Sequence, residues 1–419
     1  MKGFQSAELS QVIAVDSKKC KGCDSCKSYC PTRAIEGKYG AVHSIANQDC
    51  IFCGQCLVNC PFGAPTDIID SVEKVLVKLR DPQTTVVATI APAVRIAIGE
   101  EFGFEPGTLL TKKLYGAMKQ AGFKVLDTNF TADQTIMEEG YELVARIRRH
   151  LLQEQSSADS GPLPQFTSCC PAWVRYVELN HPQLIPYLSS AKSPMMMAGA
   201  LAKTYGVREV WKTEPEHTFV VGVMPCTAKK FEASRPEFHS AAAYWRRQGR
   251  DGDYPDVDLV LTTRDLARLL KERNINLWNV SEFSDADNPL VNYSGAGTIF
   301  GNTGGVMEAA LRTAYFVLTG QEMKTLEYKP VRGLEGFKEA TLTIRDAETD
   351  QDIRLSVAVV HGIRDNIAPV IEQTLSGKSP YQFIEVMNCP GGCVNGGGQP
   401  VYPMGTSWLS KAKAILPWN

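Results

Sequence analysis

The feature that most constrains this chain is a pair of cysteine runs near its N-terminus. CKGCDSCKSYCP begins at Cys20 and CIFCGQCLVNCP begins at Cys50, so the spacing CxxCxxCxxxCP recurs 30 residues later. Three thiolates at this spacing can hold three irons of one cubane from a single loop, while the fourth cysteine reaches the neighbouring cluster. The sequence therefore predicts two [4Fe-4S] clusters, one held by Cys20, Cys23, Cys26 and Cys60 and the other by Cys50, Cys53, Cys56 and Cys30.

A structural zinc site is the alternative explanation for these cysteines. Zinc sites usually pair two CxxC units across a longer insert, whereas each run here has three closely spaced cysteines, then a fourth cysteine followed by proline. We therefore expect residues 1–66 to form a small α+β domain of the bacterial ferredoxin type, which carries single electrons. Apolar residues with a helical period then predict a connecting helix within residues 67–83.

The overall composition excludes several function classes. A formal net charge of −2 without any long basic run gives no basis for nucleic-acid binding. No window approaches the roughly 18 apolar residues of a membrane span, and Glu8 interrupts the apolar stretch that a signal peptide would need. Thirteen cysteines in a chain of this length indicate metal binding or catalysis rather than disulfides.

The sequence over residues 84–419 predicts an α/β catalytic domain. Short apolar runs such as VVATI, TFVVGVM, VDLVLTT, RLSVAVV and YQFIEVM alternate with segments of helical periodicity. This alternation predicts parallel sheets with flanking helices. Residues 284–305 are rich in Gly, Asn, Asp and Ser and should form a loop until a helix begins near Val306. Thr263 is expected to cap the helix that follows VDLVLTT.

The five remaining cysteines lie beyond predicted strands. Cys226 follows TFVVGVM, Cys389 follows FIEVM with Cys393 four residues later, and Cys169 and Cys170 follow the short extended stretch PQFTS. Because loops converge at the carboxyl ends of parallel strands, we expect the five sulfurs to meet at one place. Four sulfurs suffice for one more cubane, which leaves one over. Taken singly, each cysteine would more often be an inert core residue.

Three segments around these cysteines resemble the signature segments of the [FeFe]-hydrogenases. They are TSCCPAW at 167–173, MPCTAKKFEA at 224–233 and EVMNCPGGCVNGGGQP at 385–400. The resemblance runs from about residue 14 to residue 405, includes the doubled cysteine run, and is greatest to the large subunit of the two-subunit enzymes of sulfate-reducing bacteria. It implies reversible oxidation of molecular hydrogen to protons and electrons.

The resemblance also implies a composite active-site cluster. A [4Fe-4S] cube would be bridged through Cys393 to a two-iron unit that bears carbon monoxide, cyanide and a bridging dithiolate amine. Lys229 would donate a hydrogen bond to one cyanide, and the segment Ala91, Pro92, Ala93 would lie against the other. The ligands of the cube would be Cys170, Cys226, Cys389 and Cys393, and the pocket would be lined by Met224, Met387 and Phe300.

Proton transfer is assigned through the resemblance to four further residues. Cys169 would exchange a proton with the bridging amine, and the route would continue through solvent to Glu139, Ser189, Glu142 and the bulk. Periodicity alone places Glu139, Glu142 and Arg146 on one helical face, and such charged stripes are usually solvated surface. A relay carboxylate would need partial burial and a raised pKa to exchange protons near neutral pH.

Several smaller features of the sequence concern the packing around the predicted site. Ala172 stands where many family members have glycine, and the run from Met195 to Met197 is expected to be core filler. The glycines near the C-terminus could form an ordinary turn. The sharper prediction is that the backbone passes close to the cluster and supplies amide donors at Gly391, Gly392, Gly396, Gly397 and Gly398.

Non-catalytic relatives of the same fold, a hydrogen sensor or an iron–sulfur assembly factor, are the alternative function. Assembly factors lack the paired cysteine runs and sensors generally lack a counterpart of Cys169, so both features favour the enzyme. The short stretch after Pro400 suggests a separate small subunit, and the redox partner would be an electron-transfer protein such as a cytochrome or ferredoxin. We expect a periplasmic location if the small subunit carries an export signal, and otherwise a cytoplasmic one.

Overall fold

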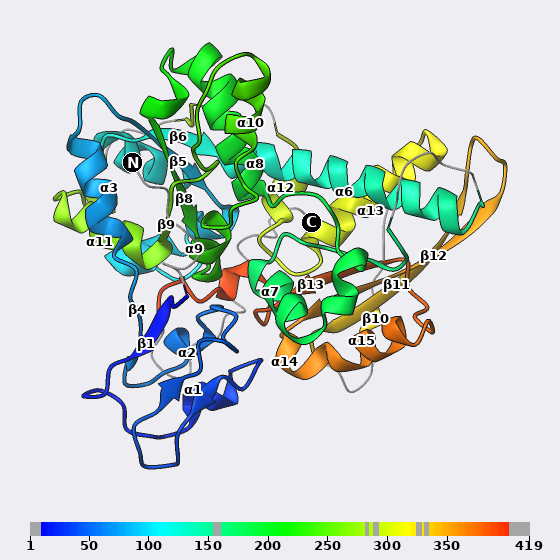
Figure 1. Ribbon diagram of the computed structural model, residues 1–419, viewed down its shortest axis with the longest axis horizontal. Helices are drawn as coiled ribbons and strands as arrows, with labels where there is room; N and C mark the ends of the chain where they lie inside the picture. Colours follow the sequence, from blue (N-terminus) through cyan, green and yellow to red (C-terminus); the bar gives the residue numbers. More distant parts are fainter. Residues whose placement is uncertain are drawn as a thin grey trace.

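The computed structural model describes residues 10–153, 161–280, 285–287, 293–323, 329–330 and 335–401. A small N-terminal α+β module lies beneath a larger α/β body (Figure 1). In the module, two short antiparallel pairs accompany two one-turn helices, each of which holds the third cysteine of its run. The pairs are β1 (Ile13–Val15) with β4 (Pro65–Asp67) and β2 (Ile35–Glu36) with β3 (Ser44–Ile45), and the helices are α1 (Ser25–Ser28) and α2 (Gln55–Val58).

A four-stranded sheet, parallel throughout, forms one half of the larger body. Its order is β6-β5-β8-β9, and its strands are β6 (Lys124–Asp127), β5 (Thr85–Ile90), β8 (Thr218–Met224) and β9 (Leu259–Thr262). Nearly every strand residue is buried, as expected for parallel strands that are covered on both faces. One apolar core joins this sheet to α3 (Ser71–Arg80), α5 (Thr111–Gln120), α8 (Pro194–Leu201) and α11 (Thr263–Glu272).

The second sheet is mixed, and its order is β10-β11-β12-β13-β7. Its strands are β7 (Gln165–Phe166), β10 (Lys329–Pro330), β11 (Phe337–Arg345), β12 (Asp352–His361) and β13 (Phe383–Met387). The strands β12, β13 and β7 run parallel, as predicted, but β11 pairs antiparallel with β12 and with β10. The turn between Arg345 and Asp352 is too short for the crossover that a parallel pair requires, so a hairpin extends the sheet.

Helices cover both faces of the mixed sheet. In Figure 1 the long helix α6 (Thr128–His150) and α13 (Gly305–Thr319) lie along one side of this sheet. Both helices pack against Leu355, Val357 and Val359. The alternate residues Ala358 and Val360 face the opposite core, which includes α15 (Ala368–Leu375). The other helices are α4 (Pro92–Arg95), α7 (Pro171–Asn180), α9 (Ala228–Ala233), α10 (Ser240–Arg247), α12 (Gly295–Ile299) and α14 (Ile363–Asn366).

Most local predictions agree with the structure, and two need correction. The connecting helix is α3, and the helix expected near Val306 begins at Gly305. The cap of α11 is Thr262 rather than Thr263, because the Thr262 hydroxyl accepts from Asp265 N while the Asp265 carboxylate accepts from Thr262 N. In the predicted loop 284–305, of which residues 288–292 and 284 lie outside the described part, α12 forms a short helix. No helix of the described ranges has the length and apolarity to cross a membrane.

Buried polar contacts join the N-terminal module to the larger body. The Lys230 ammonium lies 2.6 Å from Asp67 of the module and 2.9 Å from Asp265 of α11, and its side chain is only 2% exposed. Nearby, the Thr227 hydroxyl donates to the carbonyl oxygen of Phe52 at 2.6 Å, and Arg175 donates to that of Cys50 at 2.8 Å. In Figure 1 the red C-terminal segment lies between the blue module and the rest of the molecule. The two parts therefore share an interface with buried polar contacts.

We predict that Lys230→Met destabilises the protein by about 3 to 5 kcal/mol, because two carboxylates would lose their shared buried counter-charge. The measurement is denaturant unfolding of the anaerobic holoprotein. Arg268→Met is the matched control, since Arg268 pairs with Asp70 at the exposed surface and its loss should change stability by less than about 1 kcal/mol. Equal effects of the two substitutions would contradict this prediction.

Candidate active site

The five cysteines of the larger body surround one enclosed cavity. The carboxyl ends of strands from both sheets lie beside this cavity. These strands are β5, which ends at Ile90, β8 at Met224, β13 at Met387 and β7 at Phe166. The loops that follow these strands line the cavity. Its walls include every residue predicted from the resemblance to hold or contact the cluster, which are Ala91, Pro92, Ala93, Cys169, Cys170, Met224, Cys226, Lys229, Phe300, Met387, Cys389 and Cys393.

Four of these thiols lie close enough to interact electrostatically. The pKa of Cys226 is raised to about 12, chiefly by burial and then by the charge of Cys170. The pKa of Cys389 is raised by burial and then by its neighbours, which are Cys226, Cys53, Cys170 and Cys393. Burial raises the pKa of Cys170, and the peptide N–H groups of Asn388, Trp173 and Ala172 partly oppose this rise. Buried thiolates of this kind need a cationic centre, and the donor set therefore fits a metal cluster.

The eight N-terminal cysteines separate into two groups. Cys26 interacts with Cys60, Cys20 and Cys23, and its pKa is raised to about 11, mainly by burial. Cys30 instead lies with Cys50, Cys53 and Cys56. Peptide N–H groups donate to sulfur in the first group, from His43 to Cys20 and from Ala64 to Cys60, each at 3.4 Å. The two groups have the composition that the spacing predicted, with the fourth cysteine of each run beside the other run.

All thirteen cysteines are free thiols. Across the described ranges, no group of three or more His, Cys, Asp or Glu side chains is arranged to hold a single metal ion. His43 is a neighbour of the first cysteine group that sequence reasoning missed. Its Nδ1 lies 3.5 Å from Cys26 Sγ and its Nε2 lies 3.0 Å from Asp24. No sequence spacing relates His43 to the cysteine run, so only the fold identifies this contact.

Lys229 has a buried partner that the sequence did not indicate. Its ammonium lies 2.6 Å from the Glu232 carboxylate and donates to the carbonyl oxygen of Cys169 at 3.2 Å. Burial is the largest single effect and by itself would lower the pKa of Lys229. The charge and hydrogen bond of Glu232, together with the charges of Cys169 and Cys226, outweigh burial, and the pKa is raised. Glu232 follows Lys229 by three residues on α9, a common surface pairing. Lys229 therefore stays cationic at the cavity wall.

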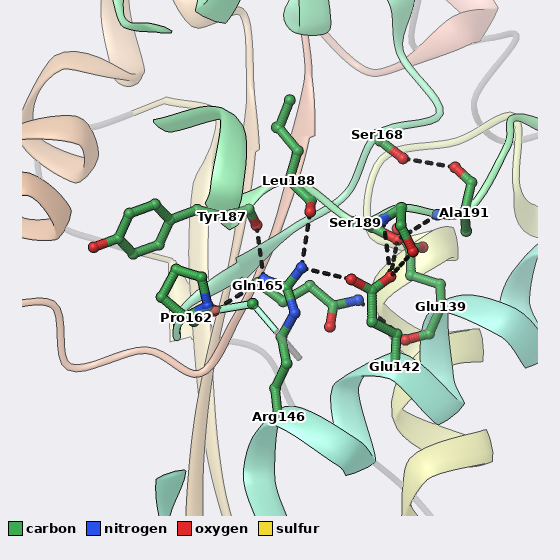
Figure 2. A network of polar contacts seen from close by, with 12 residues as sticks. Glu139, Glu142, Arg146, Pro162, Gln165, Ser168, Tyr187, Leu188, Ser189 and Ala191 are labelled. Atoms are coloured by element: carbon green, nitrogen blue, oxygen red, sulfur yellow. Dashed lines mark hydrogen bonds and ion pairs between the residues drawn. The ribbon is translucent and has the colours of Figure 1, made fainter. Parts of the chain in front are cut away.

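Of the predicted relay residues, Glu139 and Glu142 lie on α6 and Ser189 lies on the segment that precedes α8, and Figure 2 shows these three side chains close together. Glu139 is buried, and its carboxylate oxygens make no hydrogen bond of ordinary geometry with the described residues, although Ser189 and the peptide N–H of Ser168 lie near enough to oppose the rise in its pKa. Its pKa is raised to about 8, first by burial and then by the charge of Glu142. Ser189 Oγ donates to Glu142 at 3.0 Å, and Glu142 lines a surface depression together with Tyr141. Glu139 also acts electrostatically on Cys169.

Arg146 holds Glu142 in this position. Its guanidinium lies 2.5 Å from the Glu142 carboxylate and donates to the carbonyl oxygens of Tyr187 and Leu188, as Figure 2 shows. The charged stripe predicted on α6 is therefore largely buried, since Glu139 and Arg146 are 1% and 2% exposed. Sequence periodicity could not reveal this burial, because the segment that covers the helix face comes from residues 187–190.

The C-terminal glycines allow close backbone contacts at the edge of the cavity. A Cβ at Gly396 would overlap the carbonyl oxygen of Pro225, and one at Gly397 would overlap that of Cys53. The N–H groups of Gly392, Gly396 and Gly398 donate to backbone carbonyls rather than to sulfur. Glycine is required here because backbones of different loops touch, although Gly392 and Gly396 also line the cavity. The Gly391 N–H donates to His361, whose pKa is lowered to about 4 by burial.

The methionine run is mostly core, as expected. Met195 and Met196 belong to the apolar core of the parallel sheet, and Met195 also reaches the cavity. Ala172 is buried and lines the cavity. A further buried carboxylate, Glu385, accepts N–H groups of Gly304 and Met307 at the start of α13, and its pKa is raised to about 7, chiefly by burial. Glu385 therefore acts as a helix cap beside the site.

One cavity lined by cysteines lies at the ends of parallel strands, beside a module with two further cysteine groups. This arrangement is typical of iron–sulfur redox proteins. The family comparisons identify the member of this class. Residues 84–397 match the family "Iron only hydrogenase large subunit, C-terminal domain", and residues 19–64 match a "4Fe-4S dicluster domain". The chain belongs to the iron-only hydrogenase family.

Individual relatives agree with this assignment. The chain is 44% identical over 393 residues to the periplasmic [Fe] hydrogenase large subunit of Nitratidesulfovibrio vulgaris, covering 93% of this chain and 87% of the relative. It is similar to the solved structure of an [FeFe]-hydrogenase from Chlamydomonas reinhardtii, with 37% identity, a TM-score of 0.71, and coverage of 84% of this chain and 89% of that one. A cytosolic iron–sulfur assembly component from Mus musculus is 33% identical over 374 residues, 85% of this chain and 71% of the relative. The chain is accordingly an [FeFe]-hydrogenase, and the assembly factors are more distant relatives.

Glu139 should make stability depend on pH. Between pH 4.5 and about 8 the unfolded chain has released this proton while the folded protein keeps it, so rising pH destabilises the folded state by about 1.4 kcal/mol per unit. Glutamine does not titrate in this window. We therefore predict that the stability of Glu139→Gln relative to the wild type increases as the pH rises across it. Thermal unfolding at pH 5, 6.5 and 8 measures the difference.

Glu138→Gln, on the exposed face of the same helix, is the matched control for this experiment. A Glu139→Gln difference that stays constant from pH 5 to pH 8 would refute the buried, protonated state of Glu139.

Proposed function

We propose that this hydrogenase oxidises molecular hydrogen reversibly to two protons and two electrons at a [4Fe-4S] cube bridged to a two-iron unit. One observation carries the proposal: five sulfurs from three separate loops face one cavity, and four of them interact with one another. These four are Cys170, Cys226, Cys389 and Cys393, and Cys393 would form the bridge. When bound, the composite group would polarise the hydrogen molecule and accept its electrons.

The cavity walls would orient the two-iron unit and exclude water from it. Lys229, kept cationic by Glu232, would donate to one cyanide, since an anionic ligand in a dry pocket needs a charged donor. The segment Ala91 to Ala93 would face the other cyanide. Met224, Met387 and Phe300 would supply apolar bulk without an exchangeable proton. Cys169 would be the thiol of the wall that exchanges a proton with the bound group.

Protons would leave through Cys169, Glu139, Ser189 and Glu142, with solvent between the first two. The raised pKa of Glu139, about 8, supports this role because a relay group must exchange protons near neutral pH. The Ser189 hydroxyl contacts Glu142, which borders the surface depression. Arg146 would be a positioning residue, since it holds Glu142 but lies outside this route.

Electrons would leave through the two ferredoxin-type clusters. The second group, Cys50, Cys53, Cys56 and Cys30, lies nearer to the cavity, because Cys53 interacts with both Cys226 and Cys389. The first group would pass electrons to a partner protein such as a cytochrome or ferredoxin. We assign residues 1–66 to the ferredoxin-like domain, residues 67–83 to the connecting helix region and residues 84–419 to the catalytic domain.

A separate small subunit and a periplasmic location complete the proposal. The relative from Nitratidesulfovibrio vulgaris is named as a large subunit and as periplasmic, which supports both. Export would then depend on a signal carried by the small subunit. A non-catalytic sensor or assembly factor is the alternative, but the paired cysteine groups and the position of Cys169 at the cavity favour the enzyme.

Infrared spectroscopy of the anaerobically matured protein tests the proposed active site. We predict bands from metal-bound carbon monoxide and cyanide, and these bands should be lost when Cys393→Ala removes the bridging sulfur. Iron–sulfur signals without any such bands after maturation would exclude hydrogen activation at this cavity.

The proton route is tested by Cys169→Ser. This change keeps the cluster ligands, so we predict unchanged infrared bands and a loss of hydrogen turnover of about 10² to 10⁴-fold, the usual contribution of a positioned proton-transfer group. Turnover assays with an artificial electron acceptor provide the measurement. Full activity in Cys169→Ser would remove Cys169 from the route.

A further inference from the structure

Gln55 is a buried side chain of the N-terminal module that reaches a sulfur of the catalytic cavity. It lies on α2 between Cys53 and Cys56, and it is 3% exposed. Its Nε2 lies 3.1 Å from Cys389 Sγ and 2.9 Å from the carbonyl oxygen of Asn395. Through this one side chain, a loop that holds one cysteine group contacts a thiol of another.

The orientation of the Gln55 amide follows from its partners. The carbonyl oxygen of Asn395 can only accept a hydrogen bond, so the NH₂ end of Gln55 must face it. The opposite end, Oε1, accepts from Asn59 Nδ2 at 3.4 Å. The two amide hydrogens are therefore directed at Asn395 O and at Cys389 Sγ, and the sulfur receives a donor.

The surrounding backbones hold this contact in place. A Cβ at Gly54 would meet the Thr227 hydroxyl and Gly397, and a Cβ at Gly397 would overlap Cys53 and Gly54. Glycine at both positions brings the two loops into direct contact, with Gln55 next to Gly54 in sequence. The peptide N–H of Gln55 also partly opposes the effect of burial on the pKa of Cys53. Gln55 thus lies beside Cys53 of the second N-terminal group and beside Cys389 of the catalytic cavity.

We propose that Gln55 is a positioning residue that tunes the catalytic [4Fe-4S] cube from the ferredoxin module, by donating an N–H···S hydrogen bond to Cys389. This inference rests on the proposed function, in which Cys389 is a ligand of that cube. When one electron passes from the catalytic cube to the neighbouring cluster, the first is oxidised and the second is reduced. The hydrogen bond favours the reduced catalytic cube.

The physical reason is the added charge. Reduction places one more negative charge on the cube and its thiolates, and a donor to sulfur stabilises the more negative state more strongly. Hydrogen bonds to the sulfurs are among the factors that set the reduction potentials of such clusters. Asn388 Nδ2 lies 3.6 Å from the same sulfur, so Gln55 provides the shorter side-chain contact.

The test replaces Gln55 by the unbranched, donor-free methionine. Protein with its iron–sulfur clusters but without the two-iron unit is titrated with dithionite and followed by electron paramagnetic resonance. We expect Gln55→Met to lower the midpoint potential of the catalytic cube, with about a tenfold loss in its electron-binding constant, or about 59 mV for a one-electron couple. Thr227→Val is the matched control, because it also removes a donor to a carbonyl across the interface but none to sulfur.

The outcomes separate this inference from the proposed function. A shift in Gln55→Met alone supports the inference, whereas equal shifts in both variants or no shift in either would overturn it. The iron and sulfide content of the wild-type protein is measured as well. A content below that of three cubanes per chain would instead refute Cys389 as a ligand and the proposed function. If Gln55→Met fails to assemble, wild-type protein carrying ¹⁵N in its glutamine side chains must show a ¹⁵N hyperfine coupling to the reduced catalytic cube, and its absence overturns the inference.

Discussion

The burial of cysteine sulfurs around one cavity is the constraint on which the rest of the structure depends. Thiols that face one another away from water resist ionisation, as the raised pKa values of Cys226 and Cys389 show. A cluster of iron ions removes that penalty because it supplies the missing positive charge. The surrounding peptide N–H groups help only in part, so the fold and its metal are interdependent.

The contact between the N-terminal module and the catalytic body follows from the need to bring redox groups together. The module is fixed by the buried Lys230 ion pairs and by direct backbone contact at Gly54 and Gly397. Glycine in the C-terminal segment is explained by this contact more than by access to the cavity. The same contact lets Gln55 reach Cys389, so residues of this interface also lie on the proposed electron path.

Much of the fold and of the site was predictable because its signals are local. The cysteine spacing is repeated within single loops, and strand and helix periodicities are properties of short segments, so β5, β8, α3 and the cysteine positions agree with expectation. The hairpin of β11 and β12 was missed because apolar runs carry no direction, and the turn that sets it is only visible once both strands are known. The predicted cap of α11, Thr263, was wrong by one residue, because the reciprocal hydrogen bonds between Thr262 and Asp265 are visible only in the folded helix.

The sequence by itself determined the chemistry that the chain can support: three sets of sulfurs, a spare cysteine and a lysine beside them. Only the tertiary structure decided which groups are neutralised or tuned, since Glu232, His43 and Gln55 gain their roles from contacts made after folding. Residues 55 and 389 are 334 positions apart, and no local pattern can encode such a contact. Burial likewise depends on what covers a surface, which is why the α6 carboxylate at Glu139 could be judged only in the folded chain.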